Sequence, residues 1–115
     1  MTNNRERGKR GERECRDAVA RAWRCRATRT AQHSGKGKAD VDALPGVHIE
    51  CKRRRALSVL AFHDQAKADS EGTGDVPVVV MRADRDERWM LMLDLADFET
   101  LARIVLGHVD GEAKR

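Results

Sequence analysis

The sequence predicts a mixed α/β domain, in which a central sheet of about five strands is flanked by helices. Two observations lead to this fold class. Helical apolar periodicity marks three segments, near residues 11–27, 58–69 and 94–107, and short strand-like runs lie between them. The resulting order is a helix, three strands, a helix, two strands and a helix, which is typical of a mixed sheet covered by helices. A chain of 115 residues is expected to form one domain, residues 1–115, around a single core.

The first helix is expected over residues 11–27, because its apolar side chains recur at helical spacing: Cys15, Ala18, Val19, Ala22 and Trp23. At about 100° per residue, Glu12 lies at the edge of this stripe, whereas Glu14 points about 160° away from it. Glu12 is therefore the acid that is expected to face the protein. Residues 1–10 are expected to form a flexible basic arm before the helix.

Three strands are expected between residues 28 and 54. A polar strand opens this segment, a glycine-containing loop with two lysines follows, and a short strand carries two acids, Asp40 and Asp42. The Pro45-Gly46 pair then predicts a tight turn into the third strand.

That third strand has two chemically different faces. Its apolar and polar residues alternate, with Val47, Ile49 and Cys51 on one face and His48, Glu50 and Lys52 on the other. Glu50 and Lys52 therefore point the same way, and Cys51 points into the core.

The C-terminal half is expected to hold two helices and two strands. Ser58 is a candidate N-cap for a helix that runs to about Asp69. Two apolar runs, VPVVVMR and RWMLML, predict buried strands joined by a charged hairpin. Asp94 is a candidate cap for the last helix, which Gly107 is expected to close, and residues 108–115 are expected to fray.

The charge is uneven along the chain. Residues 1–63 carry 16 Lys and Arg against 7 Asp and Glu, whereas residues 64–115 carry 7 against 12. A basic half on a small domain indicates a polyanionic partner such as nucleic acid, with a merely solvated surface as the alternative. The two Trp and two Phe residues are too few for the stacking platforms of single-strand binders, so a duplex or branched nucleic acid fits better.

The composition also argues against several classes of protein. No apolar run approaches the ~20 residues that span a bilayer, and the charged N-terminus is unlike a signal peptide, so no membrane contact and a cytoplasmic location are expected. The three cysteines form no CxxC pair, and their odd number favours reduced thiols over disulfides. The four histidines have no short ligand spacing, which argues against a zinc site.

Acids and a lysine in the middle of the chain match the needs of phosphodiester hydrolysis. That reaction requires charge neutralisation and an activated water, which magnesium held by carboxylates supplies, and a lysine orients or deprotonates the water. Glu50 and Lys52, roughly 7 Å apart on one sheet face, meet these needs together with Glu12 and with Asp40 or Asp42. The spacing alone is weak evidence, because an ion pair on a solvated strand has the same pattern.

Four stretches of the sequence resemble one nuclease superfamily. GERE at 11–14 resembles its opening helix motif, SGKGKADV at 34–41 its loop and aspartate, LPGVHIECKR at 44–53 its E-x-K strand, and DQAKAD at 64–69 the helix that follows. The superfamily is that of the PD-(D/E)XK nucleases, and within it the small Holliday junction resolvases of archaea and their phage-encoded relatives. The resemblance covers about residues 8–69 and implies a restriction-endonuclease-like core.

The resemblance also implies a metal site. It implies Mg²⁺, for which Mn²⁺ can substitute, bound by the carboxylates of Glu12, Asp40 and Glu50. The backbone carbonyl of Cys51, which follows Glu50 in the strand, is a further candidate ligand.

Two more residues take roles from the resemblance, which implies Lys52 as the catalytic lysine and Gln65 as a supporting polar residue near the site. The sequence departs from the family pattern in having Ala39, not proline, before the aspartate, and in having a second acid, Asp42. The pattern of residues leaves Asp40 and Asp42 open, and the resemblance selects Asp40.

Basic and polar residues near this strand are candidates for contacts with the DNA backbone. Arg53, Arg54 and Arg55 follow the E-x-K pair directly, with a solvated charge run as the alternative. His48 shares the face of Glu50 and is expected to be a polar neighbour rather than a catalytic base. The weaker candidates for DNA contact are Lys36, Lys38, Arg29 and Ser34.

The predicted function is a magnesium-dependent, structure-selective endonuclease that resolves four-way DNA junctions. Two strands must be nicked and the chain has one E-x-K site, so a twofold homodimer is expected, with its interface at the apolar WMLML run and the last helix. There are two alternatives. One is another PD-(D/E)XK nuclease, of the repair or restriction type, and the other is a non-catalytic DNA-binding protein that uses the basic half alone.

Overall fold

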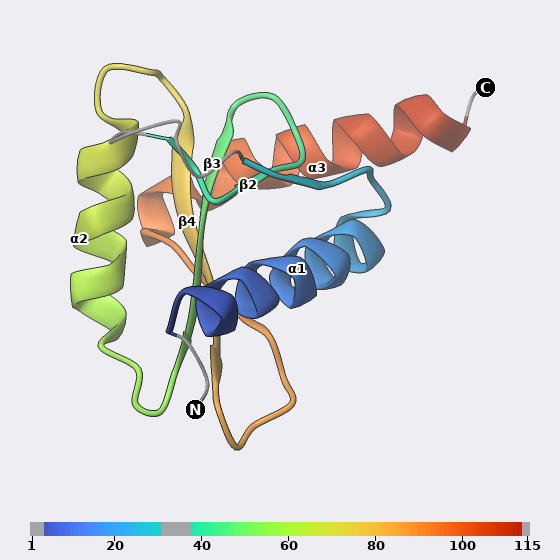
Figure 1. Ribbon diagram of the computed structural model, residues 1–115. Helices are drawn as coiled ribbons and strands as arrows, with labels where there is room; N and C mark the ends of the chain where they lie inside the picture. Colours follow the sequence, from blue (N-terminus) through green and yellow to red (C-terminus); the bar gives the residue numbers. More distant parts are fainter. Residues whose placement is uncertain (1–3, 31–37, 114–115) are drawn as a thin grey trace.

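The computed structural model describes residues 4–30 and 38–113 and confirms the predicted α/β fold class (Figure 1). Five strands form one sheet in the order β1-β2-β3-β4-β5. The central β3–β4 pair is parallel, whereas the other neighbouring pairs are antiparallel, so the sheet is mixed. The elements in chain order are α1 (Asn4–Trp23), β1 (Thr28–Arg29), β2 (Val41–Asp42), β3 (Val47–Arg54), α2 (Val59–Ser70), β4 (Val76–Ala83), β5 (Met90–Met92), the 3-10 helix η2 (Leu95–Asp97) and α3 (Phe98–Ala113).

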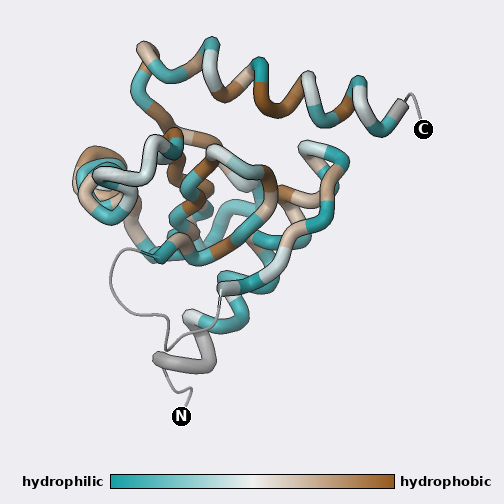
Figure 2. Tube along the Cα trace, turned by 90° about the horizontal axis from the view of Figure 1, so that it is seen from above, coloured by the Kyte–Doolittle hydropathy of each residue, from teal (hydrophilic) through white to brown (hydrophobic). Residues whose placement is uncertain are grey.

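Helices cover both faces of the sheet. α1 and α3 pack on one face, where Ile49 of β3 lies in the larger core with Cys15 of α1 and Leu101 of α3. α2 packs on the opposite face, where Ala66 and Val79 belong to a smaller apolar cluster. Figure 1 shows α1 and α2 on opposite sides of β3 and β4, and Figure 2 shows α3 running along one side of the molecule. Because both faces of β3 are covered, residues 47–52 are buried without interruption.

Two helices are longer than predicted. α1 begins at Asn4, so residues 4–10 are helical and do not form a flexible arm; this segment is rich in Arg, Lys and Glu, which favour helix. α3 continues through Gly107 to Ala113, so residues 108–113 do not fray. A glycine inside a helix costs only about 1 kcal/mol relative to alanine, and no proline follows it. None of the described helices is long and apolar enough to cross a membrane.

Of the predicted turn and the two predicted helix caps, the structure confirms the turn and one cap. Gly46 has φ of 90°, which confirms the Pro-Gly turn, because a residue with a side chain is strained at positive φ. Asp94 caps η2 as its carboxylate accepts a hydrogen bond from the Ala96 backbone N–H at 2.9 Å. Ser58 precedes α2, but its side chain makes no cap hydrogen bond.

The expectation that all cysteines are reduced is wrong. Cys15 of α1 and Cys51 of β3 form a disulfide with a Cα–Cα distance of 6.3 Å, which ties the helix to the strand. The two cysteines are 36 residues apart in the sequence, and their contact depends on how α1 is oriented across the sheet. The sequence pattern therefore does not reveal this pair. Cys25 stays a free thiol, and partial burial raises its pKa.

Candidate active site

The polar face of β3 lies under α2 and is not solvated. His48 is 3% exposed, Glu50 2% and Lys52 9%. Three ionisable side chains are thus taken out of water by the helix that follows them in the chain. Burial of this kind is costly for charged groups and is typical of functional sites. The reading of E-x-K as an ion pair on a solvated strand therefore does not apply.

The structure places Asp40, rather than Asp42, beside Glu50. One carboxylate oxygen of Asp40 accepts a hydrogen bond from the Cys51 backbone N–H at 2.9 Å, and the Asp40 backbone N–H donates to the carbonyl of Ile49 at 2.9 Å. These two bonds hold the side chain of Asp40 next to the E-x-K strand. Asp42 is exposed and pairs with Thr28 on the other side of β2.

A histidine and a second aspartate, neither predicted as a ligand, lie at the same place. His48 Nε2 is 2.9 Å from Glu50 Oε1. One potential ligand atom from each of His48, Glu50 and Asp69 lies within 4.8 Å of the other two. Asp69 comes from the last turn of α2, so the site joins that turn to the middle of β3. The spacing in the sequence does indicate where Asp69 lies. This residue follows the buried Ala66 by three positions, so both are on the face of α2 that packs on the sheet.

Lys52 lies further along the same face, where it is covered by an aromatic ring. Its ammonium nitrogen is 5.6 Å from the centre of the Phe62 ring of α2, within the range of a cation–π contact. The ring therefore shields one side of the lysine from water. Among the described residues no ion pair joins Lys52 to Glu50, so the lysine is not neutralised by its neighbour.

Burial and charge crowding shift the acid–base properties of this face. Burial raises the pKa of Glu50 to about 7, the hydrogen bond from His48 opposes this shift, and the nearby carboxyl of Asp40 adds to it. Burial alone lowers the pKa of His48, but Glu50, Asp69 and Asp40 together outweigh this effect and raise it. A carboxyl kept partly protonated at neutral pH is a group that gains from a bound cation.

Glu12 faces the protein, as predicted, but its described partner is on the edge of the sheet. Its side chain is 18% exposed and lies 3.6 Å from the Nε of Arg29 on β1. Glu12 does not belong to the cluster of ligand atoms around Glu50 in the described part of the chain. Arg29, a candidate for DNA contact, is half-buried in this pair.

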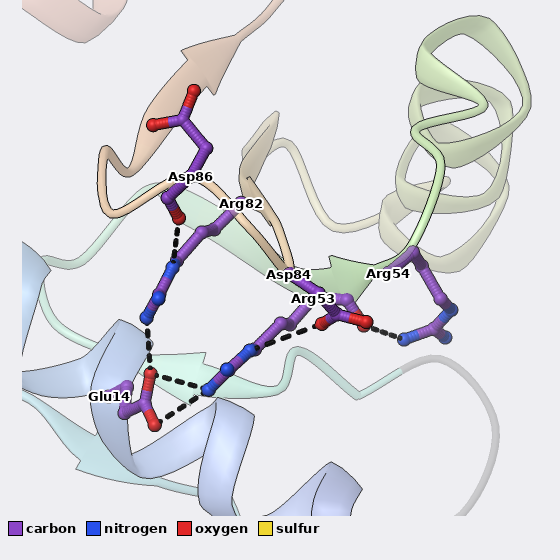
Figure 3. Close-up of polar contacts among 6 residues, drawn as sticks. All are labelled: Glu14, Arg53, Arg54, Arg82, Asp84 and Asp86. Carbon is purple, nitrogen blue, oxygen red and sulfur yellow. Dashed lines mark hydrogen bonds and ion pairs between the residues drawn. The ribbon is translucent and has the colours of Figure 1, made fainter.

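The prediction that Glu14 points away from the protein is wrong. Its two carboxylate oxygens accept hydrogen bonds from Arg53 of β3, at 2.8 and 2.9 Å, and one of them also accepts from Arg82 of β4 at 2.9 Å (Figure 3). Arg53 also pairs with Asp84 at 3.3 Å. Arg53 and Arg82 are neighbours in the parallel β3–β4 register, so both guanidinium groups can meet the same carboxylate of α1. Glu14 is therefore a shared partner of both arginines.

The remaining candidates for DNA contact are placed differently from Arg53. Arg54 and Arg55 are exposed, and Arg54 continues the row of Glu50 and Lys52 on the α2 face. Lys38 is exposed beside Asp40. Gln65, the candidate supporting residue, is exposed on α2, whereas Lys36 and Ser34 lie outside the described residues.

The donors on this face fit a divalent metal ion. Asp40 and Glu50 supply carboxylate oxygens, which suit Mg²⁺ and Mn²⁺, and Asp69 adds a third carboxylate at the end of α2. Burial is the main cause of the raised pKa of Glu50, and a divalent cation bound beside this carboxyl group would favour its charged form.

Comparison with known proteins agrees with this fold. The structure is similar to that of Hjc from Archaeoglobus fulgidus, a Holliday junction resolvase from an archaeal hyperthermophile, with a TM-score of 0.51 and 24% identity over 70% of this chain and 73% of that one. The likeness supports the PD-(D/E)XK fold. A search of curated proteins finds no match.

A family model shows the family directly. The model described as "Phage putative PDDEXK endonuclease" matches residues 3–108, which is nearly the whole chain. Nucleases with this motif typically use divalent metal ions. The predicted relationship is thereby confirmed, and the chain belongs to the phage PDDEXK endonuclease family.

Proposed function

We propose that this endonuclease is a magnesium-dependent enzyme that resolves four-way DNA junctions by paired phosphodiester hydrolysis as a homodimer. The observation that supports the proposal is that Glu50 and Lys52 share one buried face of β3, with half-buried Asp40 held beside that strand, in a chain of the PDDEXK family. Junction selectivity rests on the sequence resemblance to resolvases and on the fold shared with Hjc.

The proposed chemistry divides the work between acids and lysine. Asp40 and Glu50 would hold Mg²⁺ or Mn²⁺, together with the Cys51 carbonyl and, through a shift of its side chain, Glu12. When bound, such an ion would supply charge neutralisation at the phosphate and a more acidic water ligand. Lys52 orients the attacking water and stabilises the charge that develops on the phosphoryl oxygens, and the Phe62 ring of α2 covers one side of this lysine.

The proposed DNA path runs over exposed cations near the site. Arg54 and Arg55 lie just past Lys52, and Lys38 lies beside Asp40, so all three can reach phosphates on either side of a bound scissile bond. Lys36 and Ser34, in the adjacent loop sequence, are proposed to contact the same backbone. Arg53 is engaged by Glu14 and Asp84, and we assign it a structural role instead.

A second copy of the chain is proposed to cover an apolar surface at the end of the sheet. Four large apolar residues between positions 90 and 98 are exposed by 42–89%: Met90, Leu91, Leu95 and Phe98. They belong to β5, the edge strand, and to the start of the last helical segment. An exposed cluster of this kind favours an interface, and two strand cuts require two sites.

One assay tests the proposal. The purified chain is incubated with a four-way junction, a linear duplex of the same sequence and a single strand, with Mg²⁺ or with EDTA, and the cut positions are mapped. Paired, symmetrical nicks near the branch point that require Mg²⁺ are expected. Equal cutting of the linear duplex would remove junction selectivity and favour a repair or restriction role. Light scattering with Leu95→Asp tests the dimer, which this substitution should dissociate.

A further inference from the structure

A nitrogen donor lies inside the cluster of carboxyl groups, and the proposed acid pair alone does not account for it. His48 Nε2 is 2.9 Å from Glu50 Oε1, and both side chains are almost fully buried. Asp69 brings a third ligand atom, so that all three lie within 4.8 Å of one another. Asp69 is half-buried, which leaves the cluster open on the side where α2 ends.

The spacing suits one six-coordinate ion. Ligand atoms on adjacent corners of an octahedron with bonds of about 2.1 Å lie about 3 Å apart, and those on opposite corners about 4.2 Å apart. The His48–Glu50 distance of 2.9 Å matches the adjacent case. The ligand atoms of the cluster lie within 4.8 Å of one another, slightly more than the spacing of opposite corners. A small inward movement of one side chain would therefore suffice, and half-buried Asp69 can make this movement.

A hydrogen-bonded pair by itself is the competing explanation. An imidazole that donates to Glu50 satisfies one buried carboxylate oxygen, but it does not explain why Asp69 also faces the pair. Asp40, which is held beside the same strand by the Cys51 backbone N–H, adds a third carboxyl group to those of Glu50 and Asp69. Within residues 4–30 and 38–113, neither Asp40 nor Asp69 has an ion pair with a lysine or arginine. Such an excess of oxygen donors calls for a cation.

We propose that His48 and Asp69 bind a divalent metal ion together with Glu50, and that the imidazole makes the site prefer Mn²⁺ over Mg²⁺. This deepens the proposed nuclease function, because Glu50 is also the acid proposed to serve catalysis with Asp40. Carboxylates suit both ions, whereas a neutral imidazole is a good ligand for first-row transition ions. Mg²⁺ instead prefers oxygen ligands and keeps several of its waters.

Metal binding by the whole protein without DNA tests the proposal. Isothermal titration calorimetry with Mn²⁺ and with Mg²⁺ is expected to show at least about tenfold tighter binding of Mn²⁺. The His48→Gln variant, which keeps an N–H donor for Glu50, should lose about tenfold or more in Mn²⁺ affinity and less than about threefold in Mg²⁺ affinity. Asp69→Asn should weaken the binding of both ions. Pulsed electron paramagnetic resonance of bound Mn²⁺ should show coupling to a ¹⁴N nucleus, and this coupling should vanish in His48→Gln.

Matched substitutions elsewhere control for the loss of an imidazole or a carboxylate. His108→Gln removes a histidine whose ring contacts the carbonyl of Arg24 on the other side of the sheet, and Asp64→Asn removes an exposed acid of α2. Both should leave the affinities unchanged. Absence of ¹⁴N coupling in the unaltered protein would overturn the proposal whether or not the variants fold. If the unaltered protein cuts DNA and the His48→Gln variant keeps the same preference between Mn²⁺ and Mg²⁺, this inference alone is overturned. If the unaltered protein binds Mn²⁺ as expected but cuts no DNA, the nuclease proposal alone is overturned.

Discussion

The two faces of β3 carry ionisable side chains under opposite conditions. On the face toward α1, Arg53 has two acidic partners, Glu14 and Asp84, and the adjacent Cys51 is tied to Cys15. On the face toward α2, His48, Glu50 and Lys52 are more deeply buried than Arg53. Within the described residues they have no compensating ion pair other than that of His48 with Glu50.

The two faces of β3 therefore have different roles: the face toward α1 anchors the strand, and the face toward α2 carries the groups suited to catalysis. Paired charges and a covalent link hold β3 against the first helix, so they need no ligand to be satisfied. Buried carboxyl groups that repel one another are stable only with a proton or a cation, and such groups are typical of active sites. Substitutions on the two faces should therefore have different effects, on stability toward α1 and on cleavage toward α2.

The largest expected effect is on cleavage. Glu50→Gln and Lys52→Ala should each reduce the cutting of a four-way junction by roughly 10²–10⁴-fold or more, because each removes a group that acts at the phosphate. Gel-based cleavage assays measure the loss. Junction binding should survive Lys52→Ala, weakened by about one phosphate contact. Asp42→Asn is the control, since this exposed acid should be dispensable, and loss of cutting in this variant would assign the metal site to Asp42 in place of Asp40.

Reduction of the disulfide should have the largest effect on stability. Breaking the link between Cys15 and Cys51 frees a loop of the unfolded chain, which should lower the free energy of unfolding by about 2–4 kcal/mol. Urea denaturation with and without a reductant measures this change. The Cys25→Ala variant should show the same response to reductant as the unaltered chain, whereas Cys15→Ala should show none. An unchanged midpoint on reduction of the unaltered chain would contradict the anchoring role.

Loss of the shared carboxylate on the anchoring face should have a smaller effect. Glu14→Gln leaves the adjacent guanidinium groups of Arg53 and Arg82 without their common partner and should cost about 1–2 kcal/mol, because partial exposure screens the charges. Glu99→Gln, which breaks an exposed pair with Arg103 on α3, should cost less than about 0.5 kcal/mol. Equal losses of unfolding free energy in the two variants would contradict the larger contribution that we assign to the shared carboxylate of Glu14.

A further expected effect is a dependence of stability on pH. The pKa of Glu50 is raised from 4.5 to about 7 in the folded chain, so the folded state binds more protons than the unfolded state between these values. The metal-free protein should therefore lose stability as the pH rises through this window, and the raised pKa of His48 acts in the same direction. Thermal unfolding in EDTA measures this slope. Glu50→Gln should flatten it, and added Mg²⁺ should restore stability above about pH 7. A slope unchanged by Glu50→Gln would show that other groups cause it.

Periodicity and turn chemistry made much of the fold and part of the site predictable. The alternation around Glu50 and Lys52 placed both on one face, the Pro45-Gly46 pair located the turn, and the resemblance selected Asp40. His48 was recognised as a neighbour of Glu50 on that face, but not as part of a cluster of ligands. Asp69 was only the last residue of a predicted helix, since nothing local reveals which side of the sheet α2 covers.

By itself, the sequence determined the strands, their faces, the approximate helices and the family resemblance, because these depend on spacing along the chain. Tertiary structure alone decided which acids converge. The packing of α2 over β3 buried the E-x-K face and brought Asp69 to His48 and Glu50. The orientation of α1 across the sheet brought Cys15 to Cys51 and placed Glu14 beside Arg53. These contacts join residues 19 (Glu50 to Asp69) to 68 (Glu14 to Arg82) positions apart. They cannot be predicted from the sequence because they depend on helix orientation, which local patterns do not encode.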